Sequence, residues 1–263
     1  MDLLLKGKIA LITGSSKGLG FATATLLVQE GATVVINGRN NEQLLKAKSE
    51  LDKIPRSQVM VVSGDVSKPD FPAHLMNEIN YHFGGLDILI TNAGGPPAGG
   101  IDDFSDQDWE KAINSTFLSH LRLIRAAKPL LLKSEYPSIL TITSAAVKQP
   151  MLNMILSNSI RAATAGLTKT LANEFGPLGI RVNSILPGWT DTERIQELMQ
   201  TRVKKNKSTL DEEYQKQAQE SPLRRIGKPE EFARAAVFLV SPAASYIHGV
   251  MLTVDGGLNK GLL

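Results

Sequence analysis

Residues 8–20 read KIALITGSSKGLG, an apolar run that passes directly into a glycine-rich turn. The apolar run has the length and composition of a strand buried inside a parallel sheet. Gly14, Gly18 and Gly20 let the chain turn tightly and let its backbone approach a ligand closely. A helix is predicted to follow from Leu19, and the positive end of its dipole favours a phosphate group. Because this turn follows the first strand of a strand–helix–strand unit, it predicts a pyrophosphate site there.

Apolar runs of strand length alternate with amphipathic stretches of helical period along the rest of the chain. Strands are predicted at 8–13, 33–37, 58–62, 86–90, 138–143, 180–186 and 250–254. Helices are predicted at 19–30, 41–51, 71–83, 107–133, 154–175 and 229–239, with Gly31, Gly84 and Gly176 at helix ends. This alternation predicts a single α/β domain over 1–263, a doubly wound parallel sheet with helices on both faces.

The composition restricts the function classes. The chain has 263 residues, a formal charge of +3 and no cysteine, which excludes a disulfide framework and a cysteine nucleophile. Its charges are spread out, so we expect no nucleic-acid partner. No apolar stretch suits a signal peptide or a membrane span, and we expect a cytoplasmic protein without a membrane partner. The four histidines lack the spacing of metal ligands, so no metal site is expected.

The end of the second predicted strand bears on the choice of cofactor. No acidic residue stands there to bind the ribose of NAD. Arg39 and Lys17 could instead flank a 2′-phosphate, Arg as a planar fork and Lys as a point charge. The alternative is that both are ordinary loop cations. NADP(H) is therefore favoured over NAD(H).

Two further strand ends carry candidate cofactor residues. Asp65 and Val66 follow the third strand and could border an adenine pocket, although Asp is common in turns. Asn92, Ala93 and Gly94 follow the fourth strand, where small residues leave room for a flat ligand. The loop 94–100 beside them combines glycines with prolines, and it either contacts substrate or only connects two elements.

Together these residues resemble the short-chain dehydrogenase/reductase family over essentially the whole chain. The resemblance rests on Gly14, Gly18, Gly20, Asp65, Asn92-Ala93-Gly94, Asn114, Ser144, Pro187-Gly188, Thr192 and Val254-Asp255-Gly256-Gly257. It implies a Rossmann-like sheet of about seven strands, a nicotinamide cofactor and hydride exchange between an alcohol and a carbonyl, for example a 3-oxoacyl compound. It also implies a homotetramer or homodimer.

The resemblance assigns roles to residues. The expected cofactor set is Gly14, Ser16, Lys17, Gly18, Leu19, Gly20, Arg39, Asp65, Val66, Asn92, Ala93, Gly94, Pro187, Gly188, Thr190 and Thr192. The backbone after Pro187-Gly188 and the Thr192 side chain would hold the nicotinamide carboxamide. Residues 193–228 correspond to the family's variable substrate loop. Their polar composition is typical of a solvated helical pair or of a mobile lid over a substrate cleft.

One departure from the family pattern affects the catalytic set. Family members carry Tyr-x-x-x-Lys thirteen residues after the active-site serine, but here Ser157 and Arg161 occupy those two positions after Ser144. The flanking residues keep the family register, and none of the four tyrosines falls in this segment. A serine hydroxyl is shorter than a phenol and a poorer proton donor. Arg161 stays charged and is not a proton shuttle.

Two hypotheses follow from this departure. In the first, the protein is an NADP(H)-dependent reductase with Ser144, Asn114, Ser157 and Arg161 as its catalytic set. Ser144 donates a hydrogen bond to the substrate oxygen, Arg161 stabilises negative charge, and a water anchored by Ser157 or Asn114 relays the proton. In the second, the double replacement leaves a nucleotide-binding protein with little or no redox activity, acting as a sensor or partner subunit.

Overall fold

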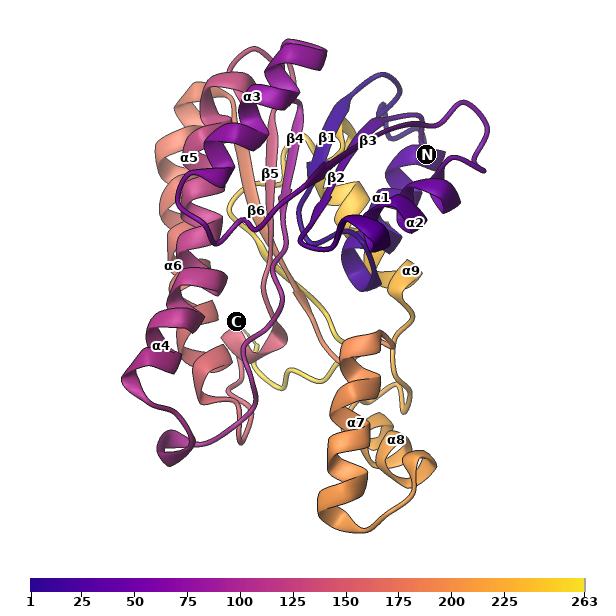
Figure 1. Cartoon of the computed structure of the whole chain (residues 1–263), viewed down its shortest axis with the longest axis vertical. Helices are drawn as coiled ribbons and strands as arrows, with labels where there is room; N and C mark the ends of the chain where they lie inside the picture. The colour runs from indigo at the N-terminus through magenta and orange to yellow at the C-terminus, as the bar shows by residue number, and fades with distance from the viewer. Residues whose placement is uncertain (263) are drawn as a thin grey trace.

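The computed structural model describes residues 1–262 and contains one sheet of seven parallel strands (Figure 1). The strands are β1 Ile9–Ile12, β2 Thr33–Gly38, β3 Gln58–Ser63, β4 Ile88–Thr91, β5 Ser138–Ile142, β6 Arg181–Pro187 and β7 Met251–Val254. Their spatial order is β3-β2-β1-β4-β5-β6-β7. The strand order reverses between β1 and β4, and ligands of open α/β sheets bind at the carboxyl edge beside such a reversal. The predicted doubly wound sheet is confirmed.

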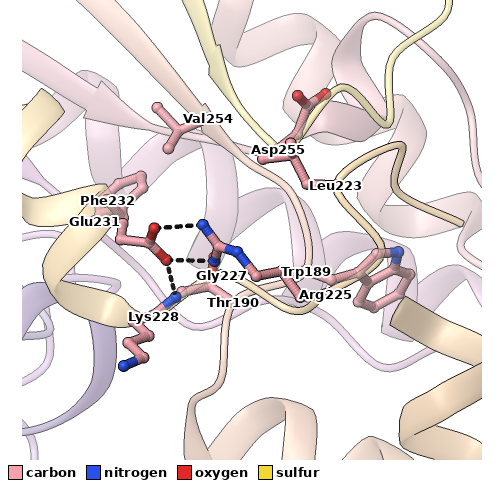
Figure 2. Close-up of a pocket in the computed structure, with 11 residues that line it drawn as sticks. Trp189, Thr190, Leu223, Arg225, Gly227, Lys228, Glu231, Phe232, Val254 and Asp255 are labelled. Atoms are coloured by element: carbon pink, nitrogen blue, oxygen red, sulfur yellow. Dashed lines mark hydrogen bonds and ion pairs between the residues drawn. The ribbon is translucent and has the colours of Figure 1, made fainter. Parts of the chain in front are cut away.

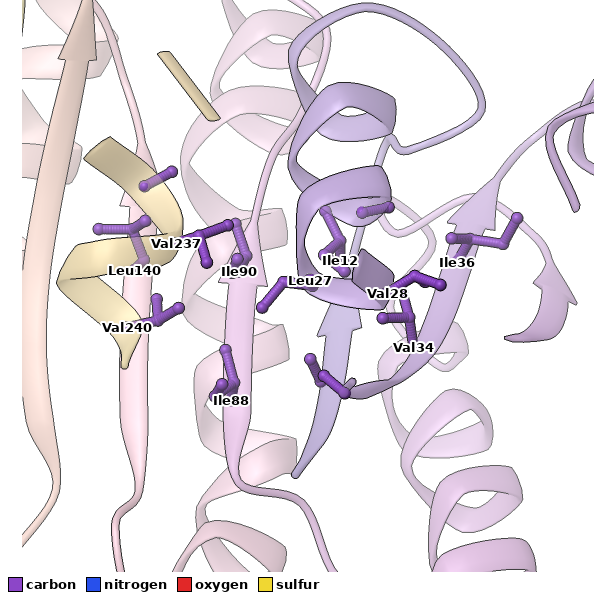
Figure 3. Close-up of a cluster of buried hydrophobic side chains, with 14 of the residues drawn as sticks. Ile12, Leu27, Val28, Val34, Ile36, Ile88, Ile90, Leu140, Val237 and Val240 are labelled. Carbon is purple, nitrogen blue, oxygen red and sulfur yellow. The ribbon is translucent and has the colours of Figure 1, made fainter. Parts of the chain in front are cut away.

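Helices cover both faces of the sheet (Figure 1). On one face lie α1 Gly18–Gln29, α2 Asn41–Leu51 and α9 Pro229–Val240; on the other lie α3 Phe71–Phe83, α5 Ser119–Leu131 and α6 Ile155–Phe175. Successive strand residues point to opposite faces. Ile12 therefore packs under α1 and α9 in the cluster of Figure 3, whereas its neighbour Leu11 packs under the other helices. This alternation buries both faces and fixes the positions of the strand ends.

The predicted helix 107–133 is divided in the structure. It consists of α4 Asp106–Ile113, a π-helical segment Asn114–Leu118 and α5. The extra residue arises because the Ser119 N–H donates to the carbonyl of Asn114, five residues earlier. Such π segments occur frequently at functional sites, and this one begins at a residue of the predicted catalytic set.

The polar segment 193–228 contains the predicted helical pair. It forms α7 Glu193–Asn206 and α8 Leu210–Gln219, which project away from the sheet (Figure 1). Buried Glu213 joins the two helices by accepting hydrogen bonds from Ser208 Oγ at 2.6 Å and Asn206 Nδ2 at 3.0 Å. These bonds lower the pKa of Glu213 to about 2, so its carboxylate is charged at neutral pH. The mobility expected of a lid stays a prediction.

Helix ends follow the predicted glycines only in part. Gly84 is the left-handed C-cap of α3, with φ 74°. Gly176 follows the last residue of α6 but stays right-handed, and the left-handed turn occurs at Gly179, with φ 77°. Within residues 1–262, no helix has the length and apolar character that crossing a membrane requires.

Candidate active site

The glycine turn after β1 is held against the ends of two neighbouring strands. Ser15 N donates to the carbonyl of Asn37 at the end of β2, at 2.9 Å. Asn92 Nδ2, beyond the end of β4, donates to the carbonyl of Gly14, also at 2.9 Å. Gly14 has φ 56°, and Asn92 packs against it so closely that a Cβ built on Gly14 would lie 2.9 Å from the backbone oxygen of Asn92. The structure thus brings together the predicted cofactor residues at these strand ends.

The first turn of α1 has the features of a pyrophosphate site. Its N-cap, Lys17, makes no side-chain capping bond, and the first turn contains no acidic residue. Backbone N–H groups at this positive helix end are therefore available to an anion. Gly20 packs so tightly that an added Cβ would lie 2.4 Å from the Gly14 oxygen, whereas a Cβ on Gly94 would meet nothing within 4 Å. The tight turn and the open surface at Gly94 fit a dinucleotide.

The two cations predicted beside a 2′-phosphate have different surroundings. Arg39 is exposed directly after β2 and makes no hydrogen bond or ion pair with another residue among 1–262. Lys17 forms an ion pair with Glu193 at the start of α7. Ser16 Oγ lies 3.4 Å from a Cβ built on Gly38, so the serine is beside the end of β2. Arg39 and Ser16 therefore border the same strand end, while Lys17 is already bound to α7.

The other predicted cofactor residues lie in the same group of turns. Leu19, Val66 and Ala93 are half-buried there, and Asp65 Oδ1 accepts from Ser67 N at 2.9 Å. Gly188 N donates to the Val254 carbonyl at 2.9 Å, which ties the turn after Pro187 to the end of β7. Buried Thr190 forms a backbone bridge with Gly227. The Thr192 methyl lies 3.6 Å from a Cβ built on Gly18, so the start of α7 reaches the start of α1.

Ser144 lies two residues beyond the end of β5, and its hydroxyl oxygen already accepts one hydrogen bond. Its Oγ accepts a hydrogen bond from Ala146 N at 3.2 Å. Since this bond uses a lone pair of the oxygen, the hydroxyl hydrogen remains available to a substrate oxygen. Ser157 and Arg161 share the buried face of α6, with exposed fractions of 3% and 8%. The Ser157 hydroxyl forms no hydrogen bond with any other part of the described chain.

Arg161 is anchored at the end of the strand that leads to Ser144. Its Nη1 donates to the carbonyl of Thr143 at 2.5 Å and lies 3.5 Å from that of Ile142. Burial, and then the charge of Arg194, lower the pKa of Arg161 to about 10. The guanidinium is therefore still charged at neutral pH. This position allows it to stabilise negative charge beside Ser144.

Asn114 is not joined to the other members of the predicted catalytic set. Its Oδ1 accepts from Arg122 Nη1 at 2.6 Å, and the same Arg122 nitrogen donates to the Ser67 carbonyl at 3.0 Å. The side chain is thus fixed toward the turn after β3. Its role in a proton relay stays a prediction.

His120 and Arg194 reach the site although sequence reasoning gave them no role. His120 is 1% exposed, and its Nδ1 lies 2.6 Å from Thr91 Oγ1. Its Nε2 is buried without a partner in the described part of the chain. Arg194 crosses from α7 to donate to the Pro96 carbonyl at 2.6 Å. Neither residue belongs to a motif, and only the packing of α5, α6 and α7 shows their proximity.

The protonation of His120 yields a pH prediction. Burial, and then the charge of Arg161, lower its pKa to about 3, so the folded protein holds a neutral imidazole that would charge near 6.5 when unfolded. As pH falls below about 6.5, the unfolded state takes up a proton on His120 while the folded state does not. The free energy of unfolding therefore decreases from about pH 6.5 down to about pH 3. We expect His120→Leu to reduce the loss of unfolding free energy between pH 7 and about pH 4.5.

Urea unfolding at the two pH values measures this effect. The exposed His74, which belongs to no ion pair among residues 1–262, supplies the control, since His74→Leu should keep the wild-type pH dependence. An unchanged pH dependence in His120→Leu would show that the buried imidazole charges in the folded state.

Two cavities lie beside the carboxyl edge. The larger has a volume of about 550 Å³ and begins at Ala145, next to Ser144. Its walls are the segment 149–154, Trp189, parts of α7 and α8, and Leu258 with Asn259. A cavity of this size is typical of a small-molecule site.

The smaller cavity, about 140 Å³, is shown in Figure 2. Arg225 and Glu231 meet across it at 2.6 and 2.7 Å, and Glu231 also accepts from Lys228 N at the start of α9. The Arg225 guanidinium is the main cause that lowers the pKa of Glu231 to about 2. Glu231 thus caps the start of α9, and the Arg225–Glu231 ion pair has a structural role in this cavity.

Comparisons with known proteins match almost the whole chain. A family model described as enoyl-(acyl carrier protein) reductase matches residues 14–259. NADPH-dependent reductase BacG of Bacillus subtilis (strain 168) is 30% identical over 256 residues, covering 97% of this chain and 99% of the relative.

Solved structures show the same architecture. L-sorbose reductase from Gluconobacter frateurii, complexed with NADPH and L-sorbose, has a TM-score of 0.95 at 33% identity, with 100% of both chains covered. An NADPH-bound short chain oxidoreductase from Pseudomonas aeruginosa PAO1, described as containing an atypical catalytic center, has a TM-score of 0.88 at 30% identity, with 97% of both chains covered.

Proposed function

This chain belongs to the short-chain dehydrogenase/reductase family, and we propose that it is an NADPH-dependent oxidoreductase acting on a carbonyl or alcohol substrate. The observation that carries the proposal is the arrangement at the end of β5. There Ser144 keeps a free hydroxyl hydrogen, and the Arg161 guanidinium is anchored one residue away. The NADPH-dependent relatives support the choice of cofactor.

The residues at the carboxyl edge would hold the dinucleotide. The N–H groups of α1 would bind the pyrophosphate, Arg39 the 2′-phosphate, and the backbone near Pro187-Gly188 with Thr192 the nicotinamide. The bound cofactor supplies or accepts the hydride, and the chain supplies position and electrostatics.

The chain's own groups handle the charge that develops on the substrate oxygen. The Ser144 hydroxyl donates a hydrogen bond to that oxygen, and Arg161 stabilises its negative charge from a buried position, where electrostatic interactions are strengthened. The Ser157 hydroxyl, buried on the same helix face, anchors a water that delivers the proton. No phenol or ammonium is required in this scheme.

Arg39 is expected to determine the preference for NADPH. Arg39→Ala should weaken NADPH binding by about 10- to 100-fold, because a charge-assisted contact with the 2′-phosphate is lost. NADH, which lacks that phosphate, should bind as before. Fluorescence titration of both cofactors measures the two dissociation constants. Lys46→Ala, on the exposed side of α2, removes the same charge and should change neither constant. Equal losses for NADH and NADPH would place the 2′-phosphate elsewhere.

Turnover distinguishes the reductase from the alternative function. The absence of both the phenol and the ammonium favours a nucleotide-binding sensor or partner subunit as the second candidate. The purified protein should consume NADPH with at least one member of a panel of aldehydes, ketones, oxo acids and keto-thioesters. Saturable NADPH binding with no turnover across the panel would support the second candidate instead.

A further inference from the structure

Two positive charges converge on the loop after β4. Arg161 comes from α6 and Arg194 from α7, and the Nη2 atoms of both lie 3.3 Å from a Cβ built on Gly95. Because both atoms lie 3.3 Å from the same point, they are at most about 7 Å apart. Like charges that close repel each other, the more so because Arg161 is buried, although Arg194 is exposed. An anion between them would compensate this repulsion.

No carboxylate in residues 1–262 supplies that compensation. Arg161 bonds only to the carbonyls of Ile142 and Thr143, and Arg194 only to that of Pro96. Neither guanidinium belongs to any ion pair of the described chain. Each guanidinium has five N–H donors, so both keep donors that the protein does not use. A buried cation such as Arg161 is normally paired with an anion, and the described chain supplies none.

We propose that the substrate carries a carboxylate, bound between Arg161 and Arg194, and that it is a short oxo acid. This inference rests on the proposed function. A guanidinium matches a carboxylate through two parallel hydrogen bonds. Arg161 is anchored to Thr143, the residue before Ser144, so the carboxylate and the reacting carbonyl are held close together. That closeness suits a 2-oxo or 3-oxo acid.

The reaction balances without a further co-reactant. The carbonyl carbon gains the hydride of NADPH, leaving NADP⁺, and the π electron pair of the C=O bond moves to the oxygen. That oxygen takes one proton from water, which gives the hydroxy acid. The two arginines hold the carboxylate throughout and exchange no proton.

A comparison of acids with their esters tests the proposal. With NADPH, 2-oxobutanoate or acetoacetate should be reduced with a kcat/KM about 100-fold above that of the corresponding methyl ester. Arg194→Gln should abolish this preference while leaving the NADPH Kd unchanged, and Arg194→Lys should retain part of it. Lys204→Gln removes an equal charge from the exposed side of α7 and should keep the full preference.

Equal kcat/KM values for acids and esters would overturn the proposal while leaving the redox function intact. An Arg194→Gln variant that binds NADPH more weakly but keeps the acid preference would also overturn it, because Arg161 and Arg194 would then bind the cofactor phosphates and not the substrate.

Calorimetry separates this proposal from the proposed function. The NADP⁺-loaded protein should bind oxalate, and Arg194→Gln should bind it at least about 10-fold more weakly. Oxalate binding by a protein that reduces nothing would support the anion site and contradict the redox function. Equal oxalate binding by the wild type and Arg194→Gln would overturn the anion site.

Discussion

Ser144→Ala is expected to lower kcat by about 100- to 1000-fold and to leave the NADPH Kd unchanged. The reason is that the Ser144 oxygen already accepts from Ala146 N, so its remaining hydrogen can be directed to the substrate oxygen as charge develops there. The variant keeps the backbone of the turn and the anchored Arg161. Steady-state rates with the best substrate, together with fluorescence titration of NADPH, measure both quantities.

Ser159→Ala is the matched control for this variant. Ser159 lies on α6 with its side chain exposed, two residues from Ser157, and its replacement should leave kcat unchanged. If Ser144→Ala retained the wild-type kcat, hydride transfer would have to occur without a hydrogen bond from this serine.

Arg161→Met should have an effect of at least the same size, about 1000-fold or more on kcat/KM. Methionine fills much of the volume but removes the charge that faces the substrate. It also leaves the carbonyl of Thr143 without its donor, so some loss of stability is expected. Steady-state kinetics give the loss of activity, and urea unfolding gives the loss of stability. The fall in kcat/KM should greatly exceed the fall in the folded fraction.

Arg161→Lys keeps the positive charge and serves as the second variant. An ammonium is a point charge and cannot reproduce the planar fork, so we expect it to recover only part of the activity. Full recovery would show that charge alone is needed at this position. Wild-type activity in Arg161→Met would remove Arg161 from the mechanism.

Local signals in the sequence predicted the layers of the fold well. The bounds of α2, Asn41–Leu51, and of α3, Phe71–Phe83, follow directly from apolar periodicity and end signals. The strands were predicted within two residues because each is an apolar run flanked by polar or glycine residues. The π segment at Asn114 was missed because one inserted residue barely disturbs a helical pattern.

The site was predictable where motifs define it and unpredictable where distant elements meet. The glycine turn and Asn92 carry local signals, and the structure joins them directly. The pairing of Lys17 with Glu193 depends on where α7 lies, which no local pattern records. Arg161, Arg194 and His120 likewise come from three different helices, α6, α7 and α5. Such contacts depend on tertiary packing, so the sequence could supply Arg161 but not its neighbours.

Transfer of deuterium is the most direct test of whether this pocket performs redox chemistry. The protein would be incubated with a carbonyl substrate and NADPH stereospecifically deuterated at C4 of the nicotinamide, in separate reactions for the two C4 positions. Mass spectrometry would then follow the alcohol product. Our account predicts that one of the two labelled cofactors gives an alcohol carrying a single deuterium on the former carbonyl carbon. Cofactor bound to saturation, with no labelled alcohol from either preparation, would contradict it.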